Sequence, residues 1–397
     1  MAVLSDYNFK GKKALIRVDF NVPLNEQFEI TDDSRIKAAI PTIKSILNQG
    51  GAVILMSHLG RPKGEKSEKY SLKHTLENLN NHLACKVTFM DDCIGEKVEK
   101  AAKELQAGEV LLLENLRFYR EEEAGDPHFS KRLADLGDVF VNDAFGTAHR
   151  AHASTTIVAS FFDDENKMFG KLIEQELEAV SRVIENNARP FTAIMGGAKI
   201  SDKILLIEKM LDKVDHLIIG GGMSYTFFKA LGGNVGNSLV EEDKVSLAKT
   251  ILDLAKEKNV QLLLPEDSII ADSFSNEANL NVAKNLTISE GWMGLDIGPK
   301  AINEFSELIK KSKTILWNGP MGVFEMSNFE KGTKGVAEAI VEATENGAYS
   351  LIGGGDSAAA IHQFNLGEKV SYISTGGGAL LEYLEGKTLP GIKAIQG

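Results

Sequence analysis

Short apolar runs alternate with stretches of helical periodicity along almost all of this 397-residue chain. This alternation constrains the fold more than any other feature, because strands separated by helices form parallel sheets that helices cover on both faces. The two halves each contain such a series, so we predict two α/β domains with doubly wound, Rossmann-like parallel sheets. The predicted strands are residues 14–18, 52–56, 110–113, 139–141, 192–195, 216–219, 261–264, 314–317, 349–352 and 370–373. The predicted helices are residues 35–47, 72–83, 94–105, 129–136, 201–211, 244–258, 299–309, 332–345 and 357–364.

A helix is also predicted between the two series, at residues 171–188, where apolar residues recur at helical spacing. Pro190 follows it, and a residue before proline disfavours the helical conformation. We place the domain boundary on this helix, with one domain at residues 1–171, a helical hinge at 172–189 and a second domain at 190–378. A rigid helical connector suits a hinge better than a flexible linker does.

The overall composition is that of an ordinary globular protein, with 43% hydrophobic and 25% charged residues. The net charge of -12 argues against nonspecific binding to nucleic acid or to anionic membranes. Cys85 and Cys93 are too few for a disulfide framework and have no partners at metal-ligand spacing. With no signal-peptide pattern and no apolar segment of spanning length, we expect a cytoplasmic protein without nucleic-acid or membrane partners.

The arginines and the glycines are divided unequally along the chain. All nine arginines lie within the first 189 residues, whereas 26 of the 37 glycines lie after residue 190. Arginine holds phosphate with a fork of N–H donors, and glycine turns hold it with backbone N–H groups. The division therefore predicts two different phosphorylated ligands, one for each half of the chain.

In the first half, polar and cationic side chains follow the predicted strands. Asp19 and Asn21 suit a ligand hydroxyl, although turn formation alone would also explain them. Arg35 begins a predicted helix, where a solvated side chain is the simpler interpretation. His or Arg also follows three more strands, in residues 57–62 (SHLGRP), 113–118 (LENLRF) and 142–152 (NDAFGTAHRAH). Because these ends meet at one edge of a parallel sheet, we predict a pocket for a small dianion that carries phosphate and carboxylate groups.

In the second half, glycines join strands to helices. Residues 195–203 (MGGAKISDK) place Lys199 and Lys203 four apart, on one face if a helix has begun by then, although solvated lysines are the alternative. Residues 352–357 (IGGGDS) bring backbone N–H groups close to a phosphate chain. Asp356 is a candidate Mg²⁺ contact there, or else an ordinary N-cap. Neither a Gly-x-x-x-x-Gly-Lys-Ser/Thr loop nor a Gly-x-Gly-x-x-Gly fingerprint occurs.

Three further motifs extend this glycine-rich set. Residues 374–379 (STGGGA) repeat the strand–glycine–helix arrangement. Residues 317–325 (WNGPMGVFE) follow another strand, and Glu325 could accept hydrogen bonds from ribose hydroxyls. Residues 293–298 (MGLDIG) could line an adenine slot with backbone and apolar groups. Together these motifs predict a nucleotide site.

Taken together, the motifs resemble the phosphoglycerate kinase family from end to end, most specifically at residues 57–62, 317–320 and 353–356. The resemblance implies reversible transfer of the acyl phosphate of 1,3-bisphosphoglycerate to ADP, giving 3-phosphoglycerate and ATP, with Mg²⁺. It also implies that residues 379–397 return to the first domain, and we expect a monomer. The resemblance assigns 3-phosphoglycerate to Asp19, Asn21, Arg35, His58, Arg61, Arg117 and Arg150. It assigns the nucleotide to Lys203, Gly294, Asn318, Glu325, Gly354, Gly355, Asp356 and Ser357. We add Gly197 to this nucleotide set and expect Asp356 to contact the metal.

The chemistry of such a reaction fits these residues. The attacking carboxylate has a typical pKa of roughly 3.5–4 and is already ionised, so no general base is needed. We expect Arg35 and either Lys199 or Lys203 to meet on the transferring phosphoryl group, with backbone donors at Gly354 and Gly377. Hinge closure would align the ligands in line and exclude water.

Two other functions remain open from the residues alone. A nicotinamide-dependent dehydrogenase also has two α/β domains, but its glycine fingerprint is missing here. A non-catalytic two-lobed binding protein would have one ligand site and no turnover. Consumption of ATP in the presence of 3-phosphoglycerate distinguishes all three functions.

Overall fold

The computed structural model describes residues 2–397 and forms two compact units. The first unit comprises the chain up to Leu177 together with Lys387–Gly397, and the second comprises Glu178–Gly386. The division thus lies within helix α6 (Lys171–Ile184) and at residues 386/387. In this division, residues 379–386 belong to the second unit, and only residues 387–397 return to the first. Within residues 2–397, no helix has both the length and the apolar character needed to cross a bilayer.

The first unit contains a six-stranded parallel sheet in the order β3-β4-β2-β1-β5-β6. Its strands are β1 (Lys13–Val18), β2 (Ala52–Met56), β3 (Val87–Phe89), β4 (Val110–Leu112), β5 (Val139–Asp143) and β6 (Lys167–Phe169). Its α-helices are α1 (Ser34–Asn48), α2 (Leu76–Leu83), α3 (Glu96–Glu104), α4 (Arg120–Ala124), α5 (Pro127–Ala134) and α14 (Pro390–Gln396). Short 3₁₀ turns complete it: η1 (Glu68–Tyr70), η2 (Leu72–Thr75), η3 (Leu116–Phe118), η4 (Phe145–Thr147) and η5 (Ile157–Phe161).

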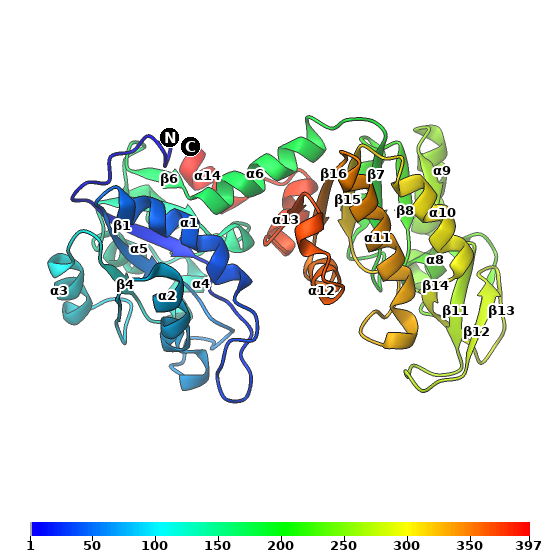
Figure 1. The fold of residues 1–397 in the computed structure, drawn as a ribbon, viewed down its shortest axis with the longest axis horizontal. Helices are drawn as coiled ribbons and strands as arrows, with labels where there is room; N and C mark the ends of the chain where they lie inside the picture. Colours follow the sequence, from blue (N-terminus) through cyan, green and yellow to red (C-terminus); the bar gives the residue numbers. More distant parts are fainter. Residues whose placement is uncertain (1) are drawn as a thin grey trace. The chain divides into compact units, whose positions relative to one another are not determined.

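Alternation along β1 separates the two faces of the first sheet. Ile16 and Val18 are fully buried in a core that includes Ile36 and Ile43 of α1. Because successive strand residues point to opposite faces, Arg17 between them lies on the other face. Helix α14 contacts β6 and η5, and Figure 1 shows this final helix, drawn in red, beside β6. The Gly391 N–H donates to the Ala148 carbonyl at 2.8 Å, so residues from the end of the chain complete the first unit.

The second unit contains a six-stranded sheet in the order β10-β8-β7-β15-β16-β17, also with parallel ladders. Numbered along the unit, this is the 3-2-1-4-5-6 order of a dinucleotide-binding fold. Its strands are β7 (Phe191–Met195), β8 (His216–Ile219), β10 (Gln261–Leu263), β15 (Thr314–Asn318), β16 (Tyr349–Gly353) and β17 (Tyr372–Ile373). Its helices are α7 (Ile204–Leu211), α8 (Ser224–Ala230), α9 (Val245–Glu257), α10 (Pro299–Ile309), α11 (Lys331–Glu345), α12 (Gly355–Gln363) and α13 (Gly378–Leu384). The predicted fold class, two doubly wound α/β sheets, is therefore confirmed.

Two small sheets in the second unit are absent from the sequence prediction. An antiparallel sheet, β12-β11-β14, is formed by β11 (Asp267–Ala271), β12 (Leu280–Lys284) and β14 (Met293–Ile297). A pair of short strands joins β9 (Asn234–Val235) to β13 (Thr287–Ile288). The 3₁₀ turns here are η6 (Glu242–Lys244), η7 (Ser327–Phe329) and η8 (Gly367–Lys369). β14 carries Gly294, one of the predicted nucleotide-binding residues.

Three helix predictions are wrong by three or more residues at one end. Helix α2 begins at Leu76 rather than 72, because residues 72–75 form the 3₁₀ turn η2. Helix α7 begins at Ile204 rather than 201, so Lys199 lies outside the helix, Lys203 is its N-cap, and the two lysines do not share a helix face. The reason is Glu241, whose carboxylate accepts hydrogen bonds from the backbone N–H groups of Ile200 at 2.7 Å and Ser201 at 3.2 Å. These bonds stabilise a turn before the helix. Helix α6 ends at Ile184 rather than 188.

Candidate active site

The C-terminal edge of the first sheet gathers the predicted cationic residues. The strand order reverses between β1 and β5, because β2 follows on one side of β1 and β5 lies on the other. Open parallel sheets bind ligands beyond such a reversal. Asp19 directly follows β1, and His58 lies two residues after β2. The sheet topology therefore places both residues at a ligand-binding edge.

Asp19 and Asn21 connect the loops at this edge. The Arg35 guanidinium donates to Asp19 Oδ2 at 2.6 Å, while the Asn21 N–H donates to Asp19 Oδ1 at 3.1 Å. The Gly60 N–H donates to Asn21 Oδ1 at 2.8 Å, and Arg117 donates to the Gly60 carbonyl at 2.9 Å. Both polar residues thus position the cationic loops as well as offering atoms to a ligand.

The remaining cations of this set differ in exposure. Arg61 and Arg150 are exposed, whereas His58 is buried, with 3% of its surface accessible. Arg61 lies near enough to Arg117 to contribute to the lowering of its pKa, although burial is the larger cause. Burial also lowers the pKa of His152 to about 4, assisted by Arg117, Arg17 and Arg150. The arginines therefore form one positive region that favours an anionic ligand.

The corresponding edge of the second sheet lies at the reversal between β7 and β15. The Gly196 N–H donates to the Asn318 carbonyl and the Gly197 N–H to the Pro320 carbonyl, both at 2.9 Å. A Cβ atom on Gly196 would clash with the backbone at Pro320, so glycine is required for this close approach. Gly197 has a φ of +103°, a conformation that favours glycine. The loops after β7 and β15 are thus joined into one surface.

Asn318 is the centre of a polar cluster at this edge. Its Oδ1 accepts a hydrogen bond from Lys203 Nζ, and its Nδ2 donates to the Gly353 carbonyl at 2.8 Å. Gly354, with a φ of +91°, lies so close to this amide that a Cβ atom would be 2.5 Å from Nδ2. The Ser357 hydroxyl accepts from the Gly319 N–H at 2.6 Å. Lys203, Asn318 and Ser357 therefore take part in the hydrogen bonds of this cluster, and Gly354 packs against it.

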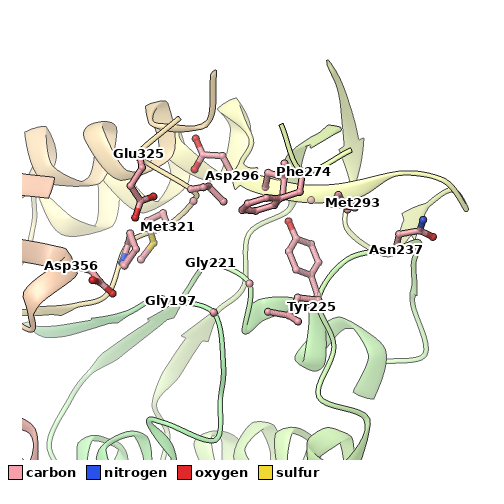
Figure 2. Close-up of a pocket in the computed structure, with 18 residues that line it drawn as sticks. Gly197, Gly221, Tyr225, Asn237, Phe274, Met293, Asp296, Met321, Glu325 and Asp356 are labelled. Atoms are coloured by element: carbon pink, nitrogen blue, oxygen red, sulfur yellow. The ribbon is translucent and has the colours of Figure 1, made fainter. Parts of the chain in front are cut away.

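A pocket of about 500 Å³ opens beside this cluster. Of the predicted residues, Gly197, Gly294, Glu325 and Asp356 line it, together with Gly221, Gly222, Tyr225, Asn237, Leu239, Phe274, Met293, Leu295, Asp296 and Met321. Figure 2 shows Asp356 and Glu325 toward one end and Tyr225, Met293 and Asn237 toward the other. The pocket therefore has an acidic, glycine-bordered end and an apolar, aromatic end, which suits a nucleotide.

Gly294 is fixed in place by the wall of this pocket. A Cβ atom on Gly294 would collide with the hydroxyl of Tyr225, which is hydrogen-bonded to the Ser268 hydroxyl at 2.7 Å. The Gly294 N–H donates to Ser238 Oγ at 3.0 Å. Burial raises the pKa of Asp296, two residues further along β14, to about 8. The residues around Gly294 thus form a rigid, largely uncharged wall.

Three predicted residues face solvent or open space in the protein without ligands. Lys199 is exposed. Gly355, at the first position of α12, and Gly377, at the N-cap of α13, have open space where a Cβ atom would lie. Such positions leave their charged or backbone donors accessible to a ligand.

The structure adds pocket-lining residues that the sequence analysis missed. Gly221 and Gly222 lie in the run of three glycines that follows β8, so the same strand-end glycine pattern could have identified them. Phe274 is 62% exposed despite lining the pocket, and no periodicity or motif marks it. Arg17 is completely buried, so it belongs beneath the first site rather than on its surface.

Comparison with known proteins decides the family. The family model for phosphoglycerate kinase matches residues 4–387. The chain belongs to the phosphoglycerate kinase family. The phosphoglycerate kinase of Porphyromonas gingivalis is 56% identical, with 99% of this chain and 100% of that protein aligned. A cytosolic phosphoglycerate kinase of Nicotiana tabacum is 53% identical over 99% of this chain and 97% of its own length.

A solved structure supports the same assignment for the fold. The phosphoglycerate kinase of Coxiella burnetii has a TM-score of 0.89 and 42% identity, covering 99% of this chain and 98% of the other. As a phosphoglycerate kinase, the chain transfers phosphate between 3-phosphoglycerate and ATP or ADP, the reaction of glycolysis. The dehydrogenase and the non-catalytic binding protein are therefore excluded.

Proposed function

We propose that the C-terminal edge of the first sheet binds 3-phosphoglycerate through Asp19, Asn21, Arg35, His58, Arg61, Arg117 and Arg150. The observation that supports this most strongly is the chain of bonds from Arg35 through Asp19 and Asn21 to Gly60. It holds two loops beside a concentration of arginines, where a carboxylate and a phosphate would each find forked donors.

We propose that the pocket of the second unit binds ADP or ATP. The apolar end near Gly294 binds the base, Glu325 binds the ribose, and the phosphate chain passes Gly197 and follows the backbone N–H groups of residues 354–357. Asn318 positions Lys203 in this arrangement through the bond to its ammonium group. Donors of these kinds neutralise phosphate charge without needing a general base.

Mg²⁺ fits the residues at the acidic end of this pocket. Asp356 is exposed at the start of α12 and lines the pocket, so its carboxylate is accessible there. Protein-bound Mg²⁺ commonly takes one or two carboxylates, with phosphate oxygens and water completing its shell. We propose Asp356 as that protein contact, and the ion would neutralise charge on the phosphates when bound.

We further propose that α6 acts as a hinge and that in-line transfer follows its closure. Arg35, one of the two lysines Lys199 and Lys203, and the N–H groups of Gly354 and Gly377 would then surround the phosphoryl group that is transferred. The domains that move would be residues 1–171 and residues 190–378, with residues 387–397 moving with the first and residues 379–386 with the second. Small-angle scattering tests this. Both ligands together should reduce the radius of gyration, whereas either ligand alone should not, and an unchanged radius with both would reject closure.

Calorimetric titration of the separate ligands tests the two sites. Arg61→Ala should weaken the binding of 3-phosphoglycerate at least tenfold without changing the affinity for ADP. Glu325→Ala should weaken the binding of ADP without changing the affinity for 3-phosphoglycerate. Arg132→Ala is the matched control, since its exposed ion pair with Glu99 at 3.2 Å contributes little. If Arg61→Ala and Arg132→Ala bind 3-phosphoglycerate equally, the proposed substrate site is wrong.

We also propose a cytoplasmic monomer. Plant relatives at 52–53% identity are named cytosolic, although an algal relative at 51% is named chloroplastic. Light scattering coupled to gel filtration should give the mass of one 43.2 kDa chain. Cell fractionation should place the protein with other cytoplasmic enzymes.

A further inference from the structure

Arg17 lies beneath the first sheet edge with none of its surface exposed. Its Nε–H donates to the Ser154 hydroxyl oxygen at 2.8 Å, and its NH2 lies 3.2 Å from Nδ1 of His58. A third guanidinium nitrogen, NH1, donates to the Val18 carbonyl. A side chain without exposed surface cannot contact a ligand directly, so any effect of Arg17 on binding passes through its neighbours.

Glu122 and Ser154 hold this guanidinium in one orientation. The Ser154 hydroxyl donates to Glu122 Oε1 at 2.6 Å, and the Ser154 N–H donates to Glu122 Oε2 at 3.0 Å. Because the hydroxyl proton goes to Glu122, its oxygen is left to accept from Arg17. All three residues are fully buried, so a broken link would leave a charge or a polar group unpaired.

The contact with His58 has only one direction. Arginine has N–H donors and no acceptor, so Nδ1 of His58 must be the acceptor and carries no proton. We infer that Arg17 is a positioning residue that holds His58 as the neutral Nε2–H tautomer, so that the imidazole offers one fixed donor to the anionic ligand. This inference deepens the proposed role of His58 and rests on that proposed substrate site.

The surrounding charges agree with a neutral imidazole. Burial lowers the pKa of His58 well below its ordinary value of 6.5. Asp19, whose Oδ1 is 3.8 Å from Nδ1, opposes this effect, and Arg17, Arg117 and Arg35 reinforce it. Protonation at Nδ1 would also set two donors against each other across the contact with Arg17. The donor at Nε2 should therefore persist, unchanged, across the physiological pH range.

Long-range ¹H–¹⁵N NMR of the intact, histidine-labelled protein tests the inference without any ligand. His58 should give the Nε2–H pattern at every pH from about 5.5 to 8.5, well below and above an ordinary imidazole pKa of about 6.5. An Nδ1–H tautomer, or an imidazolium at pH 7, would overturn the inference. This measurement needs no variant to fold, and its result does not depend on where the substrate binds.

Arg17→Lys then tests the consequence for binding. The variant keeps a cation but loses the fork, so His58 should show a signal from the Nδ1–H tautomer and the KM for 3-phosphoglycerate should rise at least tenfold. The KM for MgATP should stay constant. Equal effects on the KM of both substrates, or a His58 that stays entirely in the Nε2–H tautomer, would show that Arg17 has a merely structural role.

Two more variants separate the possible failures. Glu122→Gln keeps an acceptor for Ser154, so His58 should remain the Nε2–H tautomer. If the tautomer changes in this variant, Glu122 rather than Arg17 determines it. His58→Ala should raise the KM for 3-phosphoglycerate. If it does not, the proposed role of His58 in the substrate site fails, even where the NMR result confirms the tautomer.

Discussion

Lys203 donates a hydrogen bond to the side-chain oxygen of Asn318, and the amide nitrogen of Asn318 donates to the Gly353 carbonyl at 2.8 Å. One amide therefore joins the N-cap of α7 to the ends of β15 and β16. Both strands end at the edge where we propose the phosphate chain to bind. The position of the Lys203 ammonium group therefore depends on the neutral side chain of Asn318, which lies at the end of β15.

Replacing Asn318 by alanine should destabilise the protein and weaken nucleotide binding together. The change leaves the Lys203 ammonium and the Gly353 carbonyl without this partner, which costs about 1–3 kcal/mol for a buried polar group. Urea unfolding and calorimetric titration with ADP measure the two effects. Asn346→Ala is the control, since Asn346 makes a similar bond to the Glu342 carbonyl on an exposed helix end. Equal losses in both variants would contradict the prediction.

Nucleotide binding should weaken above pH 8. Burial lowers the pKa of Lys203 to about 8, although Asp356 and Asp202 oppose the shift, so the free enzyme loses this cation as the pH rises further. The unfolded chain keeps that proton up to about 10.4, so stability should increase with pH between these two values. In Lys203→Met both dependences should disappear. ADP affinity and urea midpoints from pH 7 to 10 check the sign, and an affinity that stays constant would count against it.

Two alanine substitutions should distinguish a glycine that packs against the protein from a glycine that leaves room for the ligand. Gly294→Ala puts a methyl group against the Tyr225 hydroxyl and should cost about 1–3 kcal/mol of stability, with a raised KM for ADP. Gly355→Ala meets no protein atom within 4 Å and should leave stability unchanged. It should still weaken ADP binding if phosphates approach this backbone. Normal ADP binding by Gly355→Ala would remove residue 355 from the site.

The Arg35→Ala variant should lose about 10²–10³ in kcat, the usual effect of removing one donor from a developing charge. The Arg35 side chain is 36% exposed but that of Asp19 is only 9% exposed, so the variant leaves a buried carboxylate without this partner and should lose about 1–3 kcal/mol of stability. Steady-state kinetics and urea unfolding separate the two effects. A decrease in kcat of less than tenfold, with binding intact, would remove Arg35 from the transition state.

Stability between pH 4 and 7 should depend on Asp143. Burial raises the pKa of this carboxyl to about 7, even though it accepts a hydrogen bond from the Leu172 N–H at 2.9 Å. The folded protein keeps a proton that the unfolded chain has lost, so stability should fall as pH rises through this window. Asp143→Asn keeps an acceptor for Leu172 and should flatten the slope of the urea midpoint. A slope identical to that of the unchanged protein would show that another group titrates.

Much of both sheets followed from apolar periodicity, because parallel strands are buried on both faces and read as short continuous runs. The strand-end motifs also predicted that Asp19, His58, Asn318 and Gly354 lie at the C-terminal edges of the two sheets, where the structure has them. The small antiparallel sheet escaped prediction because β12 is mostly exposed and carries Asn281 between apolar residues, so it lacks a buried run.

Long-range contacts account for the other differences. The start of α7 depends on Glu241, forty residues away from Ser201, and local propensity contains no information about that bond. Phe274 lines the pocket only because the loop after β11 brings it there. Likewise, the sequence shows Arg17 beside Asp19, but only the packing of Ser154 and Glu122 shows that Arg17 is buried.

The return of Lys387–Gly397 to the first unit has a consequence for synthesis of the chain. Domains generally fold in order as the ribosome produces them, from the N-terminus onward. Here residues 387–397, which include Gly391 bonded to Ala148, are needed to complete the unit made first. The second unit is continuous and can fold before them. The nascent N-terminal half therefore stays incomplete until residues 387–397 have been synthesised.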